Sequence, residues 1–505
     1  MLISGATSGI GLELARHYHH EGWRLVLLGR RDRDELDPEL FTPARYCRVD
    51  LARATAARTV VDFLDEHGVD KLHTVVHNAG VGYYGPVAQQ PDDSVRDLLQ
   101  VNLYAPVALT HALLPRLAEM QGRRPTVALV SSVAADVPVP DYAVYGASKA
   151  GLDGFARSLR AEVSPDVNVT LVHPGATRTA LHQKSGVPEG RLDTARFADA
   201  ADVARDIVRA IENERAEVTV GVANRGARAL SRHLPTPLDT LLRRRQTSAS
   251  AAPRTTPPRN LPRRCVVTGA ASGIGAALAS HYHGLGYDVV GIDLDAPAPF
   301  ITPLQADLSD LDDLERVART LAAGPSIDLL VHSAGISAVG RFSQSDLAAQ
   351  QQVLAVNLDA PILLTNRLLR EGAFSADSTL VFISSLSHFT SYPGAAVYAA
   401  SKDGLAAYAR TLSVALAPHG IHVLRVFPGP TRTPHARRYS PDNSREARRM
   451  PPDQLARLVA RALARRRYSL VPGTANKLAA LLGRWLPHTS ERLMRRLILD
   501  KLEES

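Results

Sequence analysis

One arrangement of residues occurs twice in this chain, and it restricts the possible folds more than any other feature. A Tyr is followed four residues later by a Lys at Tyr145 and again at Tyr398, and a Ser and an Asn precede each pair. A glycine-rich segment opens each copy, SGATSGIG at 4–11 and TGAASGIG at 268–275. At 505 residues the chain exceeds what one hydrophobic core usually supports. The repeat therefore predicts two domains of the same fold.

A segment between the copies is typical of a linker. Residues 246–261 are rich in Ser, Thr, Ala and Pro and lack apolar periodicity. We therefore expect a first domain over 1–245, a linker over 246–261 and a second domain over 262–505.

Short apolar runs alternate with longer amphipathic stretches within each copy. Examples are RLVLLG at 24–29, HTVVHNAG at 73–80 and TVALVSS at 126–132. Continuous apolar strands separated by helices indicate a parallel sheet covered on both faces. The predicted fold class is α/β, with two doubly wound, Rossmann-like parallel-sheet domains in tandem, and its ligand sites lie at the carboxyl ends of the strands.

Composition narrows the classes of partner. The chain is 45% hydrophobic, contains no apolar run long enough to span a bilayer, and has only two cysteines, Cys47 and Cys265, in predicted strands. Few cysteines favour a reducing compartment, so we expect a cytoplasmic protein. The net charge of +8 comes mainly from arginine. Without zinc-ligand spacing or an aromatic-rich basic motif, we expect neither a metal site nor nucleic-acid binding.

Each glycine loop is placed between a predicted strand and a predicted helix. Missing side chains there let backbone amides and the helix N-terminus approach a pyrophosphate. A glycine turn without a ligand is the alternative, and its recurrence at the head of both α/β units argues against it. The predicted cofactor-binding residues in these loops are Gly5, Ser8, Gly9, Ile10 and Gly11, and Gly269, Ser272, Gly273, Ile274 and Gly275.

The end of the second strand predicts which dinucleotide each copy prefers. In the second copy this strand ends at Asp293, near the spacing of about 20 residues at which an acid binds the ribose 2′-hydroxyl of NAD. In the first copy the aligned residue is Gly29, followed by Arg30 and Arg31, whose guanidinium groups suit a 2′-phosphate. We expect NADP in the first domain and NAD in the second. The alternative is that these are solvated turn residues.

The Tyr and Lys pairs predict acid/base chemistry. Residues four apart lie on one face of a helix, so Lys149 is next to Tyr145 and Lys402 is next to Tyr398. A free tyrosine has a pKa near 10, and we expect the neighbouring ammonium to lower it. An ordinary helix surface contact is the alternative.

A serine pair ends an apolar strand before each Tyr. A hydroxyl at this place can hold a substrate carbonyl while the Tyr gives or takes a proton. We favour the second serine of each pair, Ser132 and Ser385, over Ser131 and Ser384.

Both copies resemble the short-chain dehydrogenase/reductase family over nearly the whole chain except the linker and the C-terminal segments. The glycine loops, the NAG at 78–80, the Ser, Tyr and Lys, and the PG motifs at 174–175 and 428–429 stand in family order. The resemblance implies that each Tyr is the acid/base, that each Lys also binds the nicotinamide ribose, and that each Ser polarises the carbonyl. It further implies a water-holding role for Asn102 and Asn357, adenine contacts for Asp50 and Asp307, nicotinamide contacts for Thr179 and Thr433, and cofactor contacts for Asn78, Ser333, Pro174 and Pro428.

Those two Thr and two Asp can instead be loop caps or turn residues. Two departures from the family pattern stand out. Ser333 replaces the Asn of the NAG motif, which weakens the expected support of the second loop. The first predicted strand has only three residues before its loop and looks clipped.

Segments after each PG motif bear on the substrate. Five arginines in 434–450 suit the phosphates of an acyl carrier or coenzyme A, or form a solvated lid: Arg437, Arg438, Arg445, Arg448 and Arg449. Extensions at 218–245 and 468–502 alternate apolar and Arg positions at helical spacing. Such helices can lie on a membrane or, as we favour, cover the substrate cleft or a partner. We expect a small lipophilic or acyl-type substrate and a cytoplasmic protein with possible membrane association.

Two complete sites predict a bifunctional oxidoreductase that interconverts carbonyls and secondary alcohols with NADP at one site and NAD at the other. Because cells keep NADP largely reduced and NAD largely oxidised, the pair suits inversion of a stereocentre, or, more simply, two successive steps of one pathway. The alternative is one active domain, with the other a nucleotide-binding scaffold. In either case the copies are expected to form an intramolecular pseudo-dimer, since family members commonly pair through the helices that carry the Asn and the Tyr.

Overall fold

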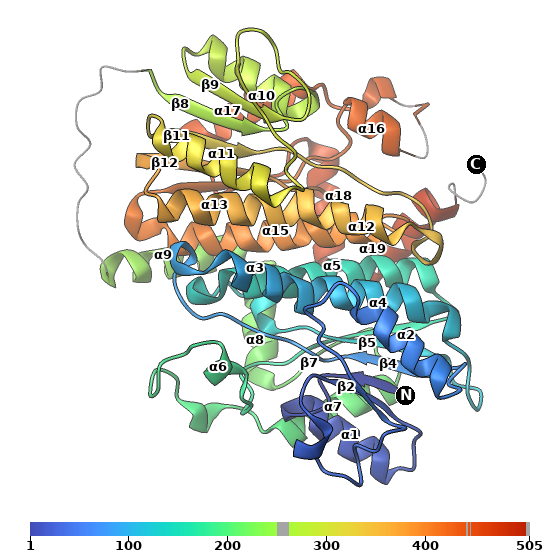
Figure 1. Ribbon diagram of the computed structural model, residues 1–505. Coiled ribbons are helices and arrows are strands. Elements are labelled where there is room, and N and C mark those ends of the chain that lie inside the picture. Colours follow the sequence, from blue (N-terminus) through green and yellow to red (C-terminus); the bar gives the residue numbers. More distant parts are fainter. Residues whose placement is uncertain (250–261, 441–442, 445, 501–505) are drawn as a thin grey trace.

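The protein contains two parallel β-sheets stacked one above the other with helices between and around them (Figure 1). The computed structural model describes residues 1–249, 262–440, 443–444 and 446–500. Each sheet has seven strands, in the orders β3-β2-β1-β4-β5-β6-β7 and β10-β9-β8-β11-β12-β13-β14. Every strand pair is parallel. The predicted tandem, doubly wound α/β fold is thereby confirmed.

The first sheet shows how an apolar strand is covered on both faces. Its central strand β1 has three residues, and alternate side chains face opposite ways: Leu2 packs toward α2 and α4, and Ile3 toward α1 and α7. Three residues suffice for pairing with both neighbours. The strands are β1 (Leu2–Ser4), β2 (Val26–Gly29), β3 (Tyr46–Arg48), β4 (Thr74–His77), β5 (Thr126–Val130), β6 (Asn168–His173) and β7 (Glu217–Thr219).

Helices cover both faces of this sheet and continue beyond its last strand. Amphipathic α1 and α7 pack on one face, and α2, α4 and α5 on the other. The helices are α1 (Gly9–His20), α2 (Ala56–Glu66), α3 (Asp92–Leu99), α4 (Ala105–Leu113), α5 (Ala143–Val163), α6 (Leu181–Lys184), α7 (Ala200–Glu212), α8 (Val222–His233) and α9 (Pro235–Ala249).

The second half repeats this plan. Its strands are β8 (Arg264–Thr268), β9 (Asp288–Asp293), β10 (Thr302–Gln305), β11 (Ile327–His332), β12 (Phe374–Ile383), β13 (His422–Val426) and β14 (Ser469–Leu470). Its helices are α10 (Gly273–Gly284), α11 (Leu311–Ala323), α12 (Leu347–Leu354), α13 (Ala360–Arg370), α14 (Ser387–Thr390), α15 (Ala396–Ala415), α16 (Pro434–Tyr439), α17 (Pro452–Ala464), α18 (Thr474–Trp485) and α19 (Pro487–Met494).

The two halves meet through the helices that carry the Tyr and Lys pairs. Helices α5 and α15 lie against each other in the middle of the molecule (Figure 1). Apolar side chains from both halves form one continuous core there, with the rings of Phe155 and Phe342 centred 5.1 Å apart. Small residues allow the close approach, since a Cβ at Gly151 would lie 3.3 Å from the carbonyl oxygen of Ala400. The halves therefore share one hydrophobic core.

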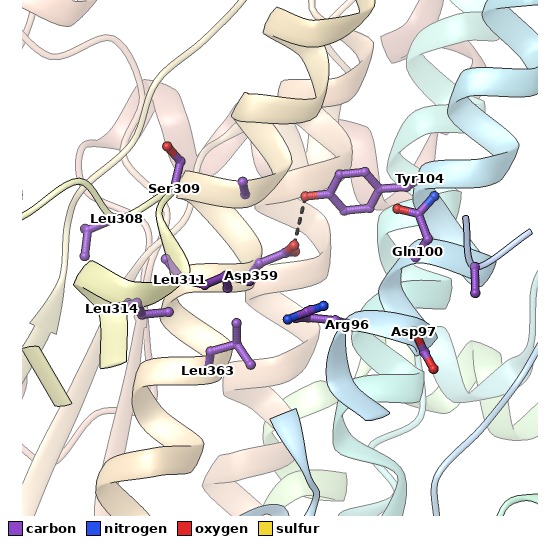
Figure 2. A pocket seen from close by; sticks show the side chains of 13 residues that line it. Arg96, Asp97, Gln100, Tyr104, Leu308, Ser309, Leu311, Leu314, Asp359 and Leu363 are labelled. Carbon is purple, nitrogen blue, oxygen red and sulfur yellow. Dashed lines mark hydrogen bonds between the residues drawn. The ribbon is translucent and has the colours of Figure 1, made fainter. Parts of the chain in front are cut away.

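Equivalent residues of the two halves face each other across this interface. Tyr104 and Asp359 end matching π-helical turns, Gln100–Tyr104 and Ala355–Asp359. The Tyr104 hydroxyl donates a hydrogen bond of 2.8 Å to Asp359 Oδ2, as Figure 2 shows. Both residues line a cavity of about 250 Å³ between the halves. Burial raises the pKa of Asp359 to about 7. The halves are thus related by an approximate two-fold axis through this contact.

C-terminal helices of each half reach across to the other half. Helix α9 packs on α15, where Asp239 accepts hydrogen bonds from Arg410 at 2.7 and 3.0 Å. Helix α19 packs on α5, where Glu491 accepts from Arg160 at 3.1 Å. The C-terminal helices of each half therefore cover part of the surface of the other half.

The division into two domains and a linker stays a prediction. Helix α9 continues to Ala249, so the first residues of the predicted linker at 246–261 are helical. The long run of helix-compatible residues after Pro235 outweighs the Ser, Thr and Ala content on which the prediction relied. The rest of the predicted linker lies outside the described residues. None of the helices in the described ranges has both the length and the hydropathy needed to cross a bilayer.

Candidate active sites

Each glycine loop is folded so tightly that only glycine fits. Gly5 and Gly9 have φ of +66° and +56°, the left-handed region that favours glycine. A Cβ at Gly11 would lie 2.2 Å from the carbonyl oxygen of Gly5. The second loop matches, with φ of +72° at Gly269 and a Cβ at Gly275 placed 1.9 Å from that residue's carbonyl oxygen.

Each glycine loop leads into the N-terminus of a helix, where backbone N–H groups can donate hydrogen bonds to a ligand. Ser8 and Ser272 stand at the N-caps of α1 and α10, and neither side chain caps its helix. Unpaired amides at a helix N-terminus suit an anion such as pyrophosphate. Ile10 packs against the first-half core, and Ile274 against the second. The residues present therefore fit a dinucleotide.

Strand register places Gly29 where the second half has Asp293. Ser4 pairs with Leu28 in one sheet and Thr268 with Ile292 in the other, so the next residues correspond. Asp293 Oδ2 accepts from the Ala271 amide at 2.9 Å, which holds its carboxylate at the glycine loop.

No carboxylate fits at the equivalent place in the first half. A Cβ at Gly29 would lie 2.4 Å from Thr7 Cγ2, because Thr7 occupies the space that Ala271 leaves open in the second half. Arg30 and Arg31 follow and are exposed. Arg31 donates to Glu35 Oε2 at 3.2 Å, whereas Arg30 forms no ion pair within the described part of the chain. The Arg30 guanidinium is therefore available to bind an anionic group of a cofactor.

The third strands end in the two predicted aspartates. Asp50 Oδ1 accepts from the Ala52 amide at 3.1 Å, and Asp307 Oδ1 accepts from the Ser309 amide and hydroxyl at 2.8 and 2.7 Å. Both side chains cap the turns that follow their strands. Asp307 also lines the cleft of the second half.

The Asn of the NAG motif supports the glycine loop of the first half, whereas the second half has a Ser at this position. Asn78 Nδ2 donates to the carbonyl oxygens of Ser4 and Gly5 at 3.1 and 3.4 Å. Ser333 keeps only a backbone contact, its amide donating to Thr268 Oγ1 at 3.1 Å. Among the described residues, no side-chain hydrogen bond from Ser333 replaces those of Asn78. The second loop is held less firmly.

The PG motifs and the threonines after them close the cofactor end of each site. Thr179 lies over the first loop, 2.8 Å from a Cβ built on Gly9, and Thr433 lies 3.2 Å from one built on Gly273. The carbonyl oxygens of Pro174 and Pro428 accept from the amides of Val133 and Leu386 at 3.0 and 2.8 Å, which ties each motif to the strand-end serines.

In the first half, strand β5 and helix α5 bring the predicted catalytic side chains together. Ser132 forms a hydrogen bond with Tyr145, while Ser131 turns away and donates to the Lys149 carbonyl at 3.2 Å. Lys149 Nζ lies 5.9 Å from the Tyr145 ring centre and donates to the Val130 carbonyl at 3.0 Å.

Asn102 braces the same site from its π-helical turn. Its side chain exchanges two hydrogen bonds of 2.9 Å with the backbone of Val81 and donates to Ser148 Oγ at 3.0 Å. The Ser148 hydroxyl donates in turn to the Tyr145 carbonyl at 2.8 Å. Because both N–H groups of its amide are used in this way, the Asn102 side chain fixes the backbone under Tyr145.

The second half reproduces this arrangement closely. Lys402 Nζ lies 5.8 Å from the Tyr398 ring centre and donates to the Ile383 carbonyl at 3.3 Å. Asn357 exchanges hydrogen bonds of 2.8 and 2.9 Å with the Ile336 backbone. Ser385 forms a hydrogen bond with Tyr398. Both sites are therefore complete in their polar side chains.

Burial controls the protonation of these groups. It raises the pKa of Tyr145 and raises that of Tyr398 to about 12, with the serine hydrogen bonds acting in the opposite direction. It lowers the pKa of Lys149 and of Lys402 to about 8. The sequence-based expectation that the lysine lowers the tyrosine pKa is wrong for this structure. Each ammonium points to a backbone carbonyl instead of the phenol, and desolvation dominates.

Aromatic residues that sequence reasoning missed surround each Tyr. Tyr142 packs edge-on to Tyr145 with centres 5.7 Å apart, and its hydroxyl lies 3.1 Å from His182 Nδ1. In the second half, Tyr392 and His435 lie 5.9 and 6.2 Å from Tyr398, centre to centre. Tyr142 is the N-cap of α5, three residues before Tyr145, and this short separation is the sequence signal that could have found it.

A large cleft runs through the second site. Its volume is about 1620 Å³, and it extends from the glycine loop past Tyr398 and Lys402 to α16 and α18. Arg438, Arg448 and Arg449 of the predicted arginine group border it, whereas Arg437 pairs with Glu446 at 2.6 Å and Arg445 lies outside the described residues. Beyond α18 the lining becomes apolar, with Met494, Leu497 and Ile498. The second C-terminal extension thus borders the cleft.

Comparison with known proteins finds one family in both halves. The family described as short chain dehydrogenase matches residues 1–189 and 263–444. Dehydrogenase/reductase SDR family member 7B of Mus musculus is 33% identical over 236 residues, 43% of this chain and 72% of the relative. Sulfoacetaldehyde reductase 2 of Chromohalobacter salexigens is 37% identical over 185 residues, 35% of this chain and 73% of the relative.

One solved structure is similar across both halves. The N-domain of a bacterial malonyl-CoA reductase, solved with NADP, has a TM-score of 0.58 and covers 84% of this chain and 90% of its own. At 15% identity this likeness shows the fold alone. Two such sheets in tandem therefore occur in another protein.

Proposed function

The chain belongs to the short-chain dehydrogenase/reductase family and is an NAD(P)-dependent oxidoreductase, and on that basis we propose that both halves are active on carbonyl and secondary alcohol groups. The observation that carries the proposal is the double set of catalytic contacts around Tyr145 and Tyr398. A half that served only as a scaffold has no need of a buried lysine whose charge is costly to desolvate.

In the proposed reduction, a bound nicotinamide nucleotide supplies the hydride. Ser132 donates a hydrogen bond to the substrate carbonyl oxygen and polarises it. Tyr145 Oη is protonated at neutral pH, like an ordinary tyrosine, and burial raises its pKa further; it gives its proton to the same oxygen as the alcohol forms. Lys149, held beside Tyr145 by its hydrogen bond to the Val130 carbonyl, binds the nicotinamide ribose, as the family resemblance implies. Oxidation follows the same path in reverse, and Ser385, Tyr398 and Lys402 act likewise in the second half.

We assign NADP to the first half and NAD to the second. Arg30 offers an unpaired guanidinium at the strand end where Thr7 excludes a carboxylate, and a guanidinium suits the 2′-phosphate. Asp293 presents a carboxylate at the matching position, which accepts from a ribose hydroxyl and repels a phosphate.

The substrate we propose is small and lipophilic or of acyl type. Apolar side chains at the far end of the second cleft favour such a molecule. The name of one relative, a sulfoacetaldehyde reductase, is consistent with carbonyl reduction. If NADP is mainly reduced and NAD mainly oxidised, oxidation of an alcohol at one site followed by reduction of the ketone at the other would invert a stereocentre. The simpler arrangement is that the two sites catalyse two successive steps of one pathway.

Single-site variants test the proposal. Tyr145→Phe and Tyr398→Phe are each assayed with NADPH and NADH on a panel of ketones, aldehydes and alcohols. We expect each variant to lose turnover with one cofactor and to keep it with the other. If Tyr398→Phe leaves all turnover intact, the bifunctional proposal fails.

One observation favours a second candidate function for the second half. Ser333 does not brace the glycine loop as Asn78 does, so this half is the better candidate for a scaffold that completes the pseudo-dimer. In that case Tyr145→Phe abolishes all turnover, and the second half still binds NAD by calorimetry.

A further inference from the structure

Helix α8 turns its polar residues inward and its apolar residues outward. Its two buried residues are Arg228 and Ser231, whereas Val222 is 75% exposed and Leu230 is 45% exposed. A helix on a globular protein normally shows the opposite pattern, with its apolar stripe against the core. The outer face of α8 is therefore suited to surroundings less polar than water.

Strong contacts fix this orientation of α8. Arg228 Nε donates to Asp136 Oδ2 at 2.5 Å, and its NH1 lies 2.5 Å from Glu217 Oε1. Burial opposes both charges, but the carboxylates of Asp136 and Glu217 raise the pKa of Arg228, and the Arg228 guanidinium helps to hold the pKa of Glu217 well below its usual range. Ser231 donates to the Asp136 carbonyl at 2.6 Å. Rolling the helix to bury Leu230 would break this buried charge network.

Helix α18 has the same inverted pattern. It buries Ala480 and Gly483 and leaves Leu478, Leu481 and Trp485 exposed at 68%, 53% and 58%. Contact at Gly483 is so close that a Cβ there would lie 1.9 Å from the Phe389 carbonyl oxygen. Only the present face of α18 can approach α14, so its large side chains point away from the protein.

Helices α8 and α18 meet at their ends. The last residues of α8 and α18, His233 and Trp485, stack with ring centres 4.3 Å apart. Residues 222–249 and 474–499, here the two arms, hold ten of the fifteen large hydrophobic side chains exposed in the described ranges. We call these ten the arm face: Val222, Leu230, Leu234, Leu241, Leu478, Leu481, Trp485, Leu486, Leu493 and Leu497.

Charge on the arms is of one sign. Their exposed ionic side chains are basic: Arg225, Arg244, Arg245, Lys477, Arg492 and Arg496. The only acids in these two segments, Asp239 and Glu491, are 2% and 7% exposed and pair with Arg410 and Arg160 of the opposite half. The arms thus present apolar and cationic groups to the outside, and the exposed Asp500 follows the second arm directly.

We propose that the arm face docks this protein on an anionic lipid surface. Outward leucines and a tryptophan with flanking Arg and Lys are the combination that inserts at the headgroup boundary. A second copy of the chain is a poorer occupant, because a two-fold contact would set these mostly cationic surfaces against each other.

The second arm borders the cleft of the second half. Ala475 and Ala479 of α18, with Leu497 and Ile498 of the last helical turn, line its apolar end. Leu497 belongs both to this lining and to the arm face. Docking therefore brings a lipid phase to the mouth of the cleft, from which a lipophilic substrate enters without crossing water. This last step rests on the proposed function, whereas the docking does not.

Sedimentation with vesicles tests the docking on the full chain. We expect the protein to bind vesicles of phosphatidylcholine mixed with phosphatidylglycerol, and to bind phosphatidylcholine alone far more weakly. Leu478→Gln with Leu481→Gln removes two outward side chains and weakens binding at least about ten-fold. Arg492→Gln with Arg496→Gln weakens it about five-fold per charge, an effect that added salt hides. As the matched control, Leu285→Gln with Phe300→Gln alters equally exposed apolar residues off the arms and leaves binding unchanged.

Three results overturn the proposal: no binding by the wild type, equal binding by the arm and control variants, or a dimer in light scattering that the arm variants dissociate. Turnover of a water-soluble substrate is followed in parallel. If binding is lost and turnover persists, the docking stands and the catalytic proposal is untouched. Loss of turnover with intact vesicle binding counts against the proposed function alone.

Discussion

Replacing Arg30 by Ser should selectively weaken the use of NADPH by the first half. Arg30 follows the strand end at which Thr7 fills the space of a carboxylate, and its guanidinium has no ion-pair partner among the described residues. It is therefore available to a 2′-phosphate. NADH lacks that phosphate, so its KM should change little.

The size of the effect follows from the exposure of Arg30. A hydrogen bond to a charged group contributes about 1.5–3 kcal/mol, and an exposed arginine stands at the lower end of that range. About 1.5–2 kcal/mol corresponds to a rise of about 10- to 30-fold in the KM for NADPH. The effect should shrink as ionic strength rises.

The assay uses a Tyr398→Phe background, so that only the first half turns over. Arg33→Ser is the matched control, because Arg33 is a similarly exposed arginine that pairs with Asp34 at 3.9 Å. We expect the control to leave both KM values unchanged. An Arg30→Ser enzyme whose KM for NADPH equals that of its parent would refute the cofactor assignment of the first half.

Three further outcomes are expected. Burial lowers the pKa of Lys402 from 10.5 to about 8, so its ammonium is present below pH 8 and lost above it. In a Tyr145→Phe background, kcat/KM for reduction should therefore fall as the pH rises through about 8. A flat profile up to about pH 10 would contradict this. Asp239→Ala leaves two buried arginines without their carboxylate and should lower the free energy of unfolding by about 3–5 kcal/mol. Urea titration measures this, with the exposed Asp34→Ala expected to change it by less than about 0.5 kcal/mol; equal midpoints for the two variants would count against the arm contact. Asn78→Ser removes two hydrogen bonds to the first glycine loop and should weaken NADPH binding by about 1–2 kcal/mol. Calorimetry should show this as a higher Kd. An unchanged Kd would show that the loop does not need these hydrogen bonds.

Local patterns predicted the fold and the positions of the polar site residues because those features depend on short spacings. Tyr145 and Lys149 share one helical turn, and the glycine loops follow short apolar strands. The register between neighbouring strands then shows that Gly29 of the first half corresponds to Asp293 of the second, as the sequence comparison of the two copies predicted. The tyrosine pKa was mispredicted because it depends on burial and on where the lysine points, neither of which spacing reveals.

Exchange of the C-terminal helices between the halves lay beyond sequence reasoning. Asp239 reads as one acid in a basic helix, and only the fold shows that it pairs with Arg410 of the other half, 171 residues away. The inverted faces of α8 and α18 are equally hidden. Arg228 would be assigned to the surface by its chemistry, and it is the buried carboxylates of other elements that draw it inside.

Fusion of the two copies allows equivalent residues to differ where they meet. In a homodimer, residues at the two-fold axis face their own copies, so a tyrosine there meets a tyrosine and an acid meets an acid. A single chain has no such restriction. Here Tyr104 faces Asp359 and donates a hydrogen bond to it, and His233 stacks on Trp485 at the other contact between equivalent residues. Away from the axis no such advantage exists, and the catalytic contacts around Tyr145 and Tyr398 stay alike. The same freedom allows Gly29 and Asp293 to differ, so that one polypeptide can carry two cofactor preferences on one shared core.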